Sequence, residues 1–444
     1  QLGNFASQFY HYPSQRLKVI GVTGTNGKTS VAWLLTQLLS SMELSENLQN
    51  STYRKNVWAI SGTLGWGSLD NLQPTLNTTP GVIEFHRRLN TLCEQGFVGV
   101  ITEVSSHALI QGRVDGCDFT AAVMTQLGSD HLDYHHTIDE YAAAKSKLFM
   151  WKDLPTAIFN LSDAYGQKWL MTSTAKNNWG YANSPNTYFI NIKSPIHIMP
   201  VIAKNSLSGK FGLRTSVLYE DKIIYLEAPY LFGSFQQENY LAAVTTVFAL
   251  GYSSEKLSHA SKNLVAPPGR MQPVQTESSK VTVLVDYAHT ADALRRVLES
   301  VRTWCEGKIW IVFGCGGERD RAKRPAMMRA AAELADKIVM TQDNPRGESA
   351  TKIIKDMLAG LSHLEEIQSF IAKDFLIDEM HHLNNHLSIC ADRSTAIHYS
   401  IQHANENDIV IIAGKGHEKF QEISGKKIPF DDVAVAEQAL ILKS

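Results

Sequence analysis

The chain has 444 residues, of which 44% are hydrophobic and 19% are charged. At roughly 100 to 200 residues per domain, this length predicts two or three globular domains with substantial cores. Its 42 Lys and Arg residues nearly balance its 44 Asp and Glu residues, for a formal charge of −2, which argues against a broad surface for nucleic acid or an anionic membrane. Any anion site is therefore expected to be local.

Five widely spaced cysteines form no CxxC pair; they are Cys93, Cys117, Cys305, Cys315 and Cys390. This set predicts reduced thiols in a cytoplasmic protein rather than a disulfide frame or a zinc site. No apolar run approaches ~20 residues and no basic-then-apolar leader opens the chain, so we expect neither a membrane span nor an export signal. Because the first residue is Gln, we expect the numbered chain to begin inside a longer natural product.

The clearest chemistry lies in residues 19–30, VIGVTGTNGKTS. A β-branched run precedes the glycines and apolar residues at helical spacing follow them, which predicts a tight loop from strand to helix. Such a loop cradles phosphate with its amides, while Lys28 adds charge and Thr29 offers a hydroxyl to Mg²⁺. The fit to GxxxxGK[ST] is imperfect because Val22 stands where the first glycine belongs. The alternative is a glycine turn without a ligand.

Buried-strand patterns recur over residues 97–104 and 120–127 and from residue 156. Glu103 lies near the end of the first of these, and the carboxyl ends of parallel strands are where doubly wound sheets bind ligands. A carboxylate there suits Mg²⁺. Taken alone, however, a single Glu is more often a solvated strand end.

The motif DHLDYH at residues 130–135 mixes carboxylates and imidazoles at metal-like spacing, and the helix expected after it carries Lys145 among small residues. A lysine in such surroundings loses solvation, which favours the neutral amine, and a neutral amine can add CO₂ to become an anionic carbamate. The residues alone nevertheless favour an ordinary lysine on the surface of a helix.

A domain hinge is indicated at residues 266–272, APPGRMQ, because two prolines and a glycine cannot continue a helix. A new alternation of strands and helices begins at Val281, with Asp286 and His289 on its first loop. The later GCGG is a weak dinucleotide signal, since it is not GxGxxG followed by an acidic strand end. No role is assigned to residues 364–390.

Several motifs occur in the order found in one protein family: GTNGKT, NTT, EVSSHALIQGRV, DHLDYH, APPGRMQ, YAHT, DNPR and GKGHE. The chain resembles the Mur ligases over nearly its whole length, and within that family the MurE branch, which adds the third residue of the peptidoglycan stem. The resemblance implies an α/β fold, with a P-loop ATPase domain of mostly parallel sheet at residues 17–269 and a smaller Rossmann-like, amino-acid-binding domain at 270–444. It also implies that residues 1–16 are the linker remnant of a missing N-terminal domain that grips the uridine end of the substrate.

The activity implied by the resemblance is ATP-dependent ligation of meso-diaminopimelate to UDP-N-acetylmuramoyl-L-alanyl-D-glutamate in peptidoglycan precursor synthesis. The substrate carboxylate would attack the γ-phosphate, giving an acyl phosphate, and the incoming amine would displace phosphate. The implied cofactors are ATP, two Mg²⁺ ions and a carbamate on Lys145. The implied catalytic residues are Lys28, Glu103, His131, Lys145 and Arg270, and the implied metal ligands are Thr29, Glu103, His131 and Lys145.

The resemblance also distributes the binding residues among three ligands. For the nucleotide they are Gly24, Thr25, Asn26, Gly27, Lys28, Thr29, Ser30, Asn239, Arg270 and Asp286. For the muramoyl peptide they are Asn77, Thr78, Thr79, Ser105, Gln111 and Arg113, although two threonines before a helix are often only capping residues. For the amino acid they are Arg319, Asn344, Arg346, Gly414 and Glu418.

Within the amino-acid site, Arg346 is expected to pair with the distal carboxylate of diaminopimelate and Glu418 with its distal ammonium. The alternative is that DNP is a turn and Arg346 a solvated residue beside it. Four positions depart from the family pattern and leave local contacts to be settled; they are Gln126, Gln236, Gln272 and Ala291.

Other functions remain open at this stage. An L-lysine-adding MurE and a folylpolyglutamate synthase share the phosphate loop, but DNPR and GKGHE resemble the amino-acid site of the diaminopimelate branch. A catalytically silent, nucleotide-binding scaffold is disfavoured because all five implied catalytic residues are retained, and a P-loop GTPase because no NKxD follows. The expected partners are small molecules rather than nucleic acid or membrane. The sequence does not determine the oligomeric state, and a monomer is the simplest expectation.

Overall fold

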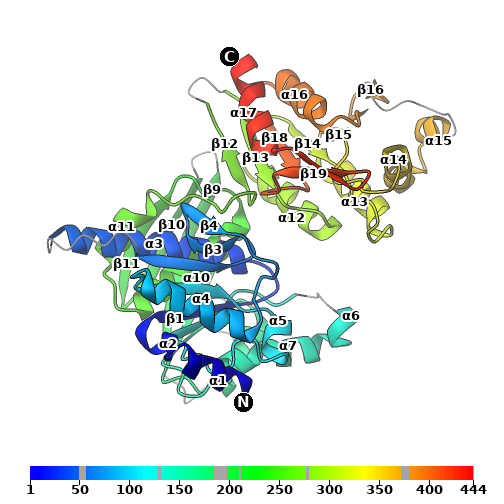
Figure 1. Cartoon of the computed structure of the whole chain (residues 1–444). Coiled ribbons are helices and arrows are strands. Elements are labelled where there is room, and N and C mark those ends of the chain that lie inside the picture. Colours follow the sequence, from blue (N-terminus) through cyan, green and yellow to red (C-terminus); the bar gives the residue numbers. More distant parts are fainter. Residues whose placement is uncertain are drawn as a thin grey trace. The chain divides into compact units, whose positions relative to one another are not determined.

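The computed structural model describes residues 1–49, 57–128, 132–184, 198–209, 212–276, 280–371 and 380–443. The chain divides into two compact units (Figure 1). The first unit comprises residues 1–207, 213–229 and 235–265, and the second comprises residues 208–212, 230–234 and 266–444.

The first unit is built on an 11-stranded sheet with the order β11-β10-β9-β8-β7-β6-β1-β5-β2-β3-β4. The strands from β9 to β2 in this order pair in parallel, whereas β2-β3-β4 at one edge and β10-β11 at the other are antiparallel. The strand bounds are β1 (Lys18–Thr23), β2 (Trp58–Gly62), β3 (Gly65–Ser68), β4 (Asn71–Gln73), β5 (Gly99–Glu103), β6 (Ala121–Met124), β7 (Thr156–Asn160), β8 (Asn177–Ala182), β9 (Ile198–Gly209), β10 (Gly212–Tyr219) and β11 (Lys222–Ala228).

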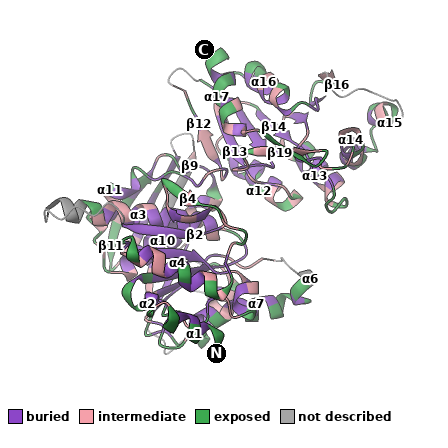
Figure 2. Ribbon diagram, in the orientation of Figure 1, coloured by how far each residue is buried: buried purple, intermediate pink, exposed green. Residues whose placement is uncertain are grey.

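The central strands are apolar on both faces because helices cover the sheet on both sides. Every residue of β5, β6 and β7 is buried. Figure 2 shows the same for β2 of this sheet, which is drawn in the buried colour. The helices of this unit are α1 (Leu2–Phe9), α2 (Pro13–Arg16), α3 (Lys28–Gln49), α4 (Val82–Glu94), α5 (Ser106–Ile110), α6 (Leu132–His135), α7 (Ile138–Ser146), η1 (Lys147–Met150), α8 (Ala164–Thr172), α10 (Ser234–Ala249) and α11 (Ser254–Ser261).

Residues 1–16, which we expected to be a linker remnant, form α1 and α2, and both helices pack against α4. Gly3 of α1 lies so close to the backbone of Asp115 that a Cβ there would collide with it. These residues are therefore an integral part of the first unit.

The second unit contains a seven-stranded sheet with the order β12-β13-β18-β14-β15-β17-β16 and a separate hairpin, β19-β20. The five inner strands are parallel, and β12 and β16 are antiparallel edges. The strand bounds are β12 (Gln272–Val274), β13 (Thr282–Asp286), β14 (Ile309–Phe313), β15 (Lys337–Met340), β16 (His381–His382), β17 (Leu387–Ile389), β18 (Ile409–Ala413), β19 (Phe420–Ile423) and β20 (Lys426–Pro429).

The helices of the second unit are α12 (Ala291–Arg302), α13 (Lys323–Leu334), α14 (Ala350–Leu358), η2 (Ala359–Leu361), α15 (Glu365–Ile371), α16 (Arg393–His403) and α17 (Asp432–Lys443). The stretch 364–390, for which the sequence indicated no role, contributes α15, β16 and β17, and its residues 372–379 lie outside the described part. The predicted α/β fold, a mostly parallel sheet followed by a second α/β unit, is confirmed. Among the described residues, no helix is both long and apolar enough to cross a membrane.

A fully buried ion pair joins the elements of the second unit. The Nε and Nη2 atoms of Arg393 each lie 2.7 Å from a carboxylate oxygen of Asp432, and both side chains are 0% exposed. Arg393 also donates to Ala413 O (3.0 Å) and Gln342 O (3.2 Å). The pair therefore joins the start of α16 and α17 to the chain that leaves β18 and β15.

Asp432→Asn is expected to destabilise the second unit by about 3 to 5 kcal/mol, because it leaves the Arg393 guanidinium buried without a counter-charge. The measurement is urea denaturation of the whole chain. The matched control is Glu333→Gln, which breaks an exposed pair with Arg295 on the same unit and should leave the unfolding midpoint nearly unchanged. Equal shifts in the two variants would contradict this role of the buried pair.

Candidate active site

The phosphate loop has the predicted strand-loop-helix geometry, with β1 ending at Thr23 and α3 beginning at Lys28. Gly24 (φ 151°) and Gly27 (φ 84°) adopt backbone conformations that favour glycine. A Cβ at Gly24 would collide with Thr125 Oγ1, and one at Gly27 with Asn239 Oδ1. The loop therefore lies directly against its neighbours and needs glycine at both positions.

The lysine of this loop is held by the loop's own carbonyl groups. Lys28 Nζ donates to Gly24 O (2.9 Å) and to Thr25 O (2.8 Å). Thr25 is anchored in turn, because its Oγ1 accepts from Gly128 N at 2.9 Å and lies 3.1 Å from Tyr141 Oη. A positive charge thus lies within a loop of backbone amides, which is the composition of an anion site.

Glu103 is 0% exposed at the end of β5, so it is not a solvated strand end. Its Oε2 accepts from Thr29 Oγ1 at 2.9 Å, and its Oε1 accepts from Thr63 N at 2.8 Å. The Thr29 hydroxyl and the Glu103 carboxylate therefore lie side by side and offer hard oxygen ligands. Within the described residues no cluster of three His, Cys, Asp or Glu side chains could hold a metal ion, and His131 lies outside those residues. Mg²⁺ commonly binds one or two protein oxygens and takes its other ligands from water and phosphate, which this pair fits.

Lys145 is buried, with 1% exposure, so the interpretation of this residue as an ordinary helix-surface lysine is wrong. Its Nζ donates to Gly24 O at 2.8 Å and lies 4.5 Å from the centre of the Tyr141 ring. Thr137 begins the helix, because its side chain accepts from Glu140 N. Lys28 and Lys145 consequently donate to the same carbonyl oxygen.

The residues expected to contact the muramoyl peptide gather around the backbone of Glu103. Thr79 Oγ1 donates to Glu103 O (2.9 Å) and accepts from Ser105 N (3.1 Å), while Arg113 Nη1 donates to Thr79 O (2.9 Å). Gln111 accepts from Arg113 Nε at 2.9 Å. Thr78 and Asn77 precede Thr79 in the same loop.

The capping alternative for the two threonines is wrong, because α4 begins after Gly81 and its cap has no side-chain hydrogen bond. Ser105 does act as a cap, for α5, by accepting from Ala108 N at 3.2 Å.

In the second unit, Asp286 ends β13 and is buried. Its two carboxylate oxygens accept from Met271 N and Ala288 N, both at 2.8 Å. Burial raises the pKa of Asp286, and the positive charge of Arg270 opposes this shift. The Arg270 guanidinium lies 4.6 Å from the centre of the Tyr287 ring. Asp286 thus holds the backbone directly after Arg270 and directly after Tyr287.

A buried lysine organises the proposed amino-acid residues of the second unit. Lys415 is 0% exposed, and its Nζ donates to Asn344 Oδ1 and to Glu418 Oε2, both at 3.1 Å. Asn344 Nδ2 also donates to Glu418 Oε2 at 2.8 Å. Burial raises the pKa of the neighbouring Asp343, whose Oδ1 lies 3.8 Å from Lys415 Nζ. The sequence interpretation placed Lys415 in the GKGHE loop but did not assign it to the site, and a lysine in a glycine loop at a strand end was the available signal.

Two arginines flank Gly316, the residue after Cys315 in the loop that leaves β14. A Cβ at Gly316 would lie 3.1 Å from Arg346 Nη1 and 3.7 Å from Arg319 Cγ. Arg346 Nη1 donates to Gly317 O at 2.8 Å, and Arg346 Nε lies 3.2 Å from Glu422 Oε2. Arg346 is therefore an anchored residue, not a solvated one beside a turn, and the sequence motifs did not indicate its partner Glu422.

The buried Arg324 stabilises the loop that contains Gly316 and Gly317. It donates to Gly316 O at 3.1 Å and pairs with Glu348 at 3.0 Å, and Glu348 accepts from Glu318 N at 2.6 Å. These bonds lower the pKa of Glu348 from 4.5 to about 2, with the hydrogen bond from Arg324 as the largest cause. Because the pKa of Glu348 is lower in the folded protein than its ordinary value, the ionised carboxylate stabilises the fold at pH values above about 4.5. This contribution is lost as the pH falls from about 4.5 towards 2.

Nothing in the described contacts explains the side chain at position 126, whereas the other three departures from the family pattern fit their surroundings. Gln126 holds Thr25 through its backbone, because its carbonyl accepts from Thr25 N at 2.7 Å. Gln236 Oε1 accepts from Asn239 Nδ2 at 3.2 Å, and Gln272 Oε1 accepts from Gly269 N at 2.8 Å. Ala291 is the first residue of α12, a position that tolerates proline without requiring it.

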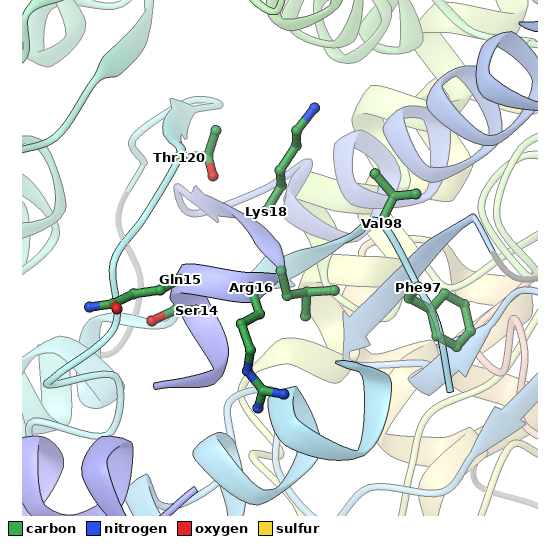
Figure 3. A pocket seen from close by; sticks show the side chains of 8 residues that line it. Ser14, Gln15, Arg16, Lys18, Phe97, Val98 and Thr120 are labelled. Atoms are coloured by element: carbon green, nitrogen blue, oxygen red, sulfur yellow. The ribbon is translucent and has the colours of Figure 1, made fainter. Parts of the chain in front are cut away.

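A hollow of about 410 Å³ lies at the amino-terminal ends of the inner strands β1, β5 and β6, whereas the phosphate loop follows the carboxyl end of β1. Figure 3 shows the side chains that line this hollow. None of its lining residues belongs to the candidate site; they are Ser14, Gln15, Arg16, Leu17, Lys18, Phe97, Val98 and Thr120. The candidate chemistry lies instead at the carboxyl ends of the strands, as doubly wound folds require.

Residues 22–247 match the family model of the Mur ligase middle domain, and residues 269–416 match that of the Mur ligase glutamate ligase domain. The chain is 37% identical to the UDP-N-acetylmuramoyl-L-alanyl-D-glutamate--2,6-diaminopimelate ligase of Pseudomonas putida, over 99% of this chain and 81% of that protein. It is 39% identical to the protein of the same name from Alkalilimnicola ehrlichii, over 99% of this chain and 80% of that protein.

Among solved structures, one of a UDP-N-acetylmuramoyl-L-alanyl-D-glutamate--2,6-diaminopimelate ligase is similar, with a TM-score of 0.69 and 32% identity. The alignment covers 99% of this chain and 82% of that one. The Mycobacterium tuberculosis folylpolyglutamate synthase, with a TM-score of 0.59, 12% identity and coverage of 99% of this chain and 94% of that one, shows likeness in fold alone.

Gly62→Ala tests the importance of Glu103 without changing it. A Cβ at Gly62 would collide with Glu103 Oε1, so the variant should displace the carboxylate from Thr29 and weaken Mg²⁺-dependent nucleotide binding by about tenfold or more. The measurement is a nucleotide titration at several Mg²⁺ concentrations. Gly81→Ala is the control, because nothing lies within 4 Å of the added Cβ. Normal binding by a folded Gly62→Ala variant would argue against the metal site.

Proposed function

The chain belongs to the Mur ligase family, and we propose that it is a member that adds meso-diaminopimelate to UDP-N-acetylmuramoyl-L-alanyl-D-glutamate in peptidoglycan precursor synthesis. The observation that carries this proposal is the match to diaminopimelate ligases at 37% and 39% identity over 99% of the chain. The enzyme is an ATP-dependent acid-amino-acid ligase.

ATP fits the phosphate loop, because Gly24 and Gly27 adopt backbone conformations that favour glycine, the loop joins a strand to a helix N-terminus, and Lys28 supplies a cation. Mg²⁺ fits the adjacent hydroxyl and carboxylate of Thr29 and Glu103. When bound, ATP supplies the phosphoryl group and Mg²⁺ neutralises its charge. Lys28 is the cation of this loop that would stabilise the anionic oxygens of the transferred group. Asn239, whose Oδ1 a Cβ at Gly27 would meet, is the proposed contact to the nucleotide.

The reaction proceeds in two substrate-centred steps. The carboxylate of the muramoyl peptide attacks the γ-phosphorus, which forms an acyl phosphate and releases ADP. The amine of diaminopimelate then attacks the acyl carbon, and the bond to phosphate breaks. Arg113, Thr79 and Ser105 orient the carboxyl substrate. None of the residues assigned here is required as a covalent nucleophile.

Lys145 acts as a carbamate in this proposal. Burial at 1% exposure removes its ammonium from water, and a second ammonium, that of Lys28, donates to the same carbonyl oxygen. Lys145 is therefore a buried amine beside a second amine, which is the setting of the proposed carbamate. A neutral amine reacts with CO₂, and the resulting carbamate carries a negative charge that suits a metal site.

The second unit supplies amino-acid selection. Arg346 and Arg319 beside Gly316 provide the cations for the distal carboxylate, and Glu418, held by Asn344 and Lys415, accepts the distal ammonium. Gly414 (φ 114°) allows the loop to leave β18 at the required angle. L-lysine lacks the distal carboxylate, so it would meet Arg346 with a like charge. The five free cysteines fit a reducing compartment such as the cytoplasm.

Phosphate release is expected only when ATP, Mg²⁺, the UDP-muramoyl dipeptide and meso-diaminopimelate are all present, and the nucleotide product should be ADP. Without the amino acid, hydroxylamine should trap the acyl phosphate as a hydroxamate. The assay is run with a panel of amino acids that includes L-lysine and L-glutamate. Release of AMP, or a preference for another amino acid, would overturn the proposed reaction.

Lys145→Ala should lose most activity while the protein stays folded, because an anionic metal-site group is lost rather than a surface charge. Short carboxylates added to the buffer should restore part of the rate by replacing the carbamate. Lys147→Ala is the matched control, since Lys147 is exposed two residues away and exposed truncations cost little. Near-normal turnover of Lys145→Ala without additives would rule out the carbamate.

Arg346→Ala should raise the KM for diaminopimelate by tens to thousands of fold, equivalent to roughly 2 to 5 kcal/mol, because a charge-assisted carboxylate partner is lost. The KM for ATP should remain almost unchanged. Steady-state kinetics with each substrate varied in turn give both constants. Arg329→Ala, an exposed arginine on α13, is the control. Unaltered selectivity in Arg346→Ala would show that this arginine does not read the amino acid.

A further inference from the structure

The amino-acid site contains a carboxylate that no family motif assigns. We propose that Glu422 is a specificity-determining residue, which offsets the charge of Arg346 and thereby limits how strongly the site prefers a distal carboxylate to a distal ammonium. This inference rests on the proposed function, because it takes Arg346 as the group that meets the distal end of the amino acid.

The backbone of Glu422 is fixed between two proposed substrate-binding residues. Glu422 lies in β19, and its N donates to Asn344 Oδ1 at 2.9 Å while its carbonyl accepts from Arg346 N, also at 2.9 Å. Ser424 N then donates to Arg346 O at 2.7 Å. These bonds place Glu422 by means of its main chain, so its carboxylate is not needed to hold the loop in place.

The side chain of Glu422 faces the guanidinium of Arg346. Its Oε2 lies 3.2 Å from Arg346 Nε, whereas Arg346 Nη1 donates to Gly317 O at 2.8 Å. Within the described part of the chain, Arg346 Nη2 has no hydrogen-bond partner. The side chains of Arg346 and Glu422 are 21% and 30% exposed, so solvent and a small ligand can reach the pair.

Most other charges near this pair already have partners. Glu418 is neutralised by Lys415 at 3.1 Å, and Glu348 by Arg324 at 3.0 Å. Arg319, on the other side of Gly316, makes no ion pair among the described residues. Glu318 also lies nearby, since its Oε1 would be 2.6 Å from a Cβ at Gly347, but Glu422 is the carboxylate in contact with the Arg346 guanidinium. Glu422 therefore affects most directly how much positive charge Arg346 presents to a ligand.

The consequence follows from the two competing amino acids. Beside the Arg346-Glu422 pair, an incoming carboxylate meets a cation whose charge is partly offset, and an incoming ammonium meets a weakened repulsion. Without the Glu422 charge, the carboxylate would be attracted more strongly and the ammonium repelled more strongly. Because the pair is partly exposed, each change should be modest, about two- to fivefold.

The test compares wild type and Glu422→Gln, a near-isosteric change, by kcat/KM for meso-diaminopimelate and for L-lysine. The ratio of these values should rise about two- to fivefold in the variant, and the rise should shrink in high salt because exposed charges are screened. Glu422→Asp, which keeps the charge, should stay close to the wild-type ratio. Glu333→Gln removes an exposed carboxylate elsewhere in the unit and should leave the ratio unchanged.

An unchanged or lower ratio in a folded Glu422→Gln protein would overturn the role of Glu422. This outcome is separate from failure of the proposed function, which is decided by the preference of the wild type. If the wild type prefers L-lysine, the proposed function is wrong, but a shift of the ratio towards diaminopimelate in Glu422→Gln still supports the counter-charge. If the wild type uses neither amino acid, both proposals are overturned.

Discussion

The phosphate site depends on the carbonyl oxygen of Gly24, which accepts hydrogen bonds from Lys28 and from the buried Lys145. Gly24 can hold this position only because it has no Cβ, since a side chain there would collide with Thr125. Two lysine side chains therefore meet at one oxygen of the loop that is proposed to bind phosphate. This meeting of two lysines at one buried oxygen is the feature on which the proposed carbamylation of Lys145 rests.

The second unit holds several charged side chains in buried positions near its strand ends. It does so by burying cations with their partners: Arg393 with Asp432, Arg324 with Glu348, and Lys415 with Glu418. Each buried cation also donates to a loop or strand-end oxygen, or to a side chain of the proposed site. The loops that carry the proposed specificity residues are therefore stabilised by electrostatics from inside the unit.

In the proposed site, selectivity between amino acids that differ in one carboxylate depends on how much of the charge of Arg346 is left without a counter-charge. A fully paired arginine would attract neither candidate, and an unpaired one would bind a carboxylate strongly. Arg346 lies between these limits, because Glu422 faces one nitrogen of the guanidinium and leaves another available. In the proposed site, the strength of recognition would thus depend on Glu422 as well as on Arg346.

The sequence alone determined the features that local patterns encode. The glycine loop after a β-branched strand and the alternation of strands and helices are short-range signals, because φ preferences and hydrophobic periodicity act over a few residues. The family motifs added the fold and the order of the candidate residues. The strand-loop-helix geometry around Gly24 and the α/β architecture were accordingly predictable from the sequence.

Tertiary structure decided which isolated residues are functional candidates and which are ordinary. The local sequence predicted a surface lysine at Lys145, but the residue is buried. Its hydrogen bond to Gly24 O spans 121 residues of sequence. The sequence motifs did not indicate Glu422, because its contact with Asn344 spans 78 residues of sequence. Taken alone, Glu103 was predicted to be a solvated strand end, but it is buried in the structure. Burial and charge compensation are properties of segments brought together by folding, and local sequence patterns do not record them.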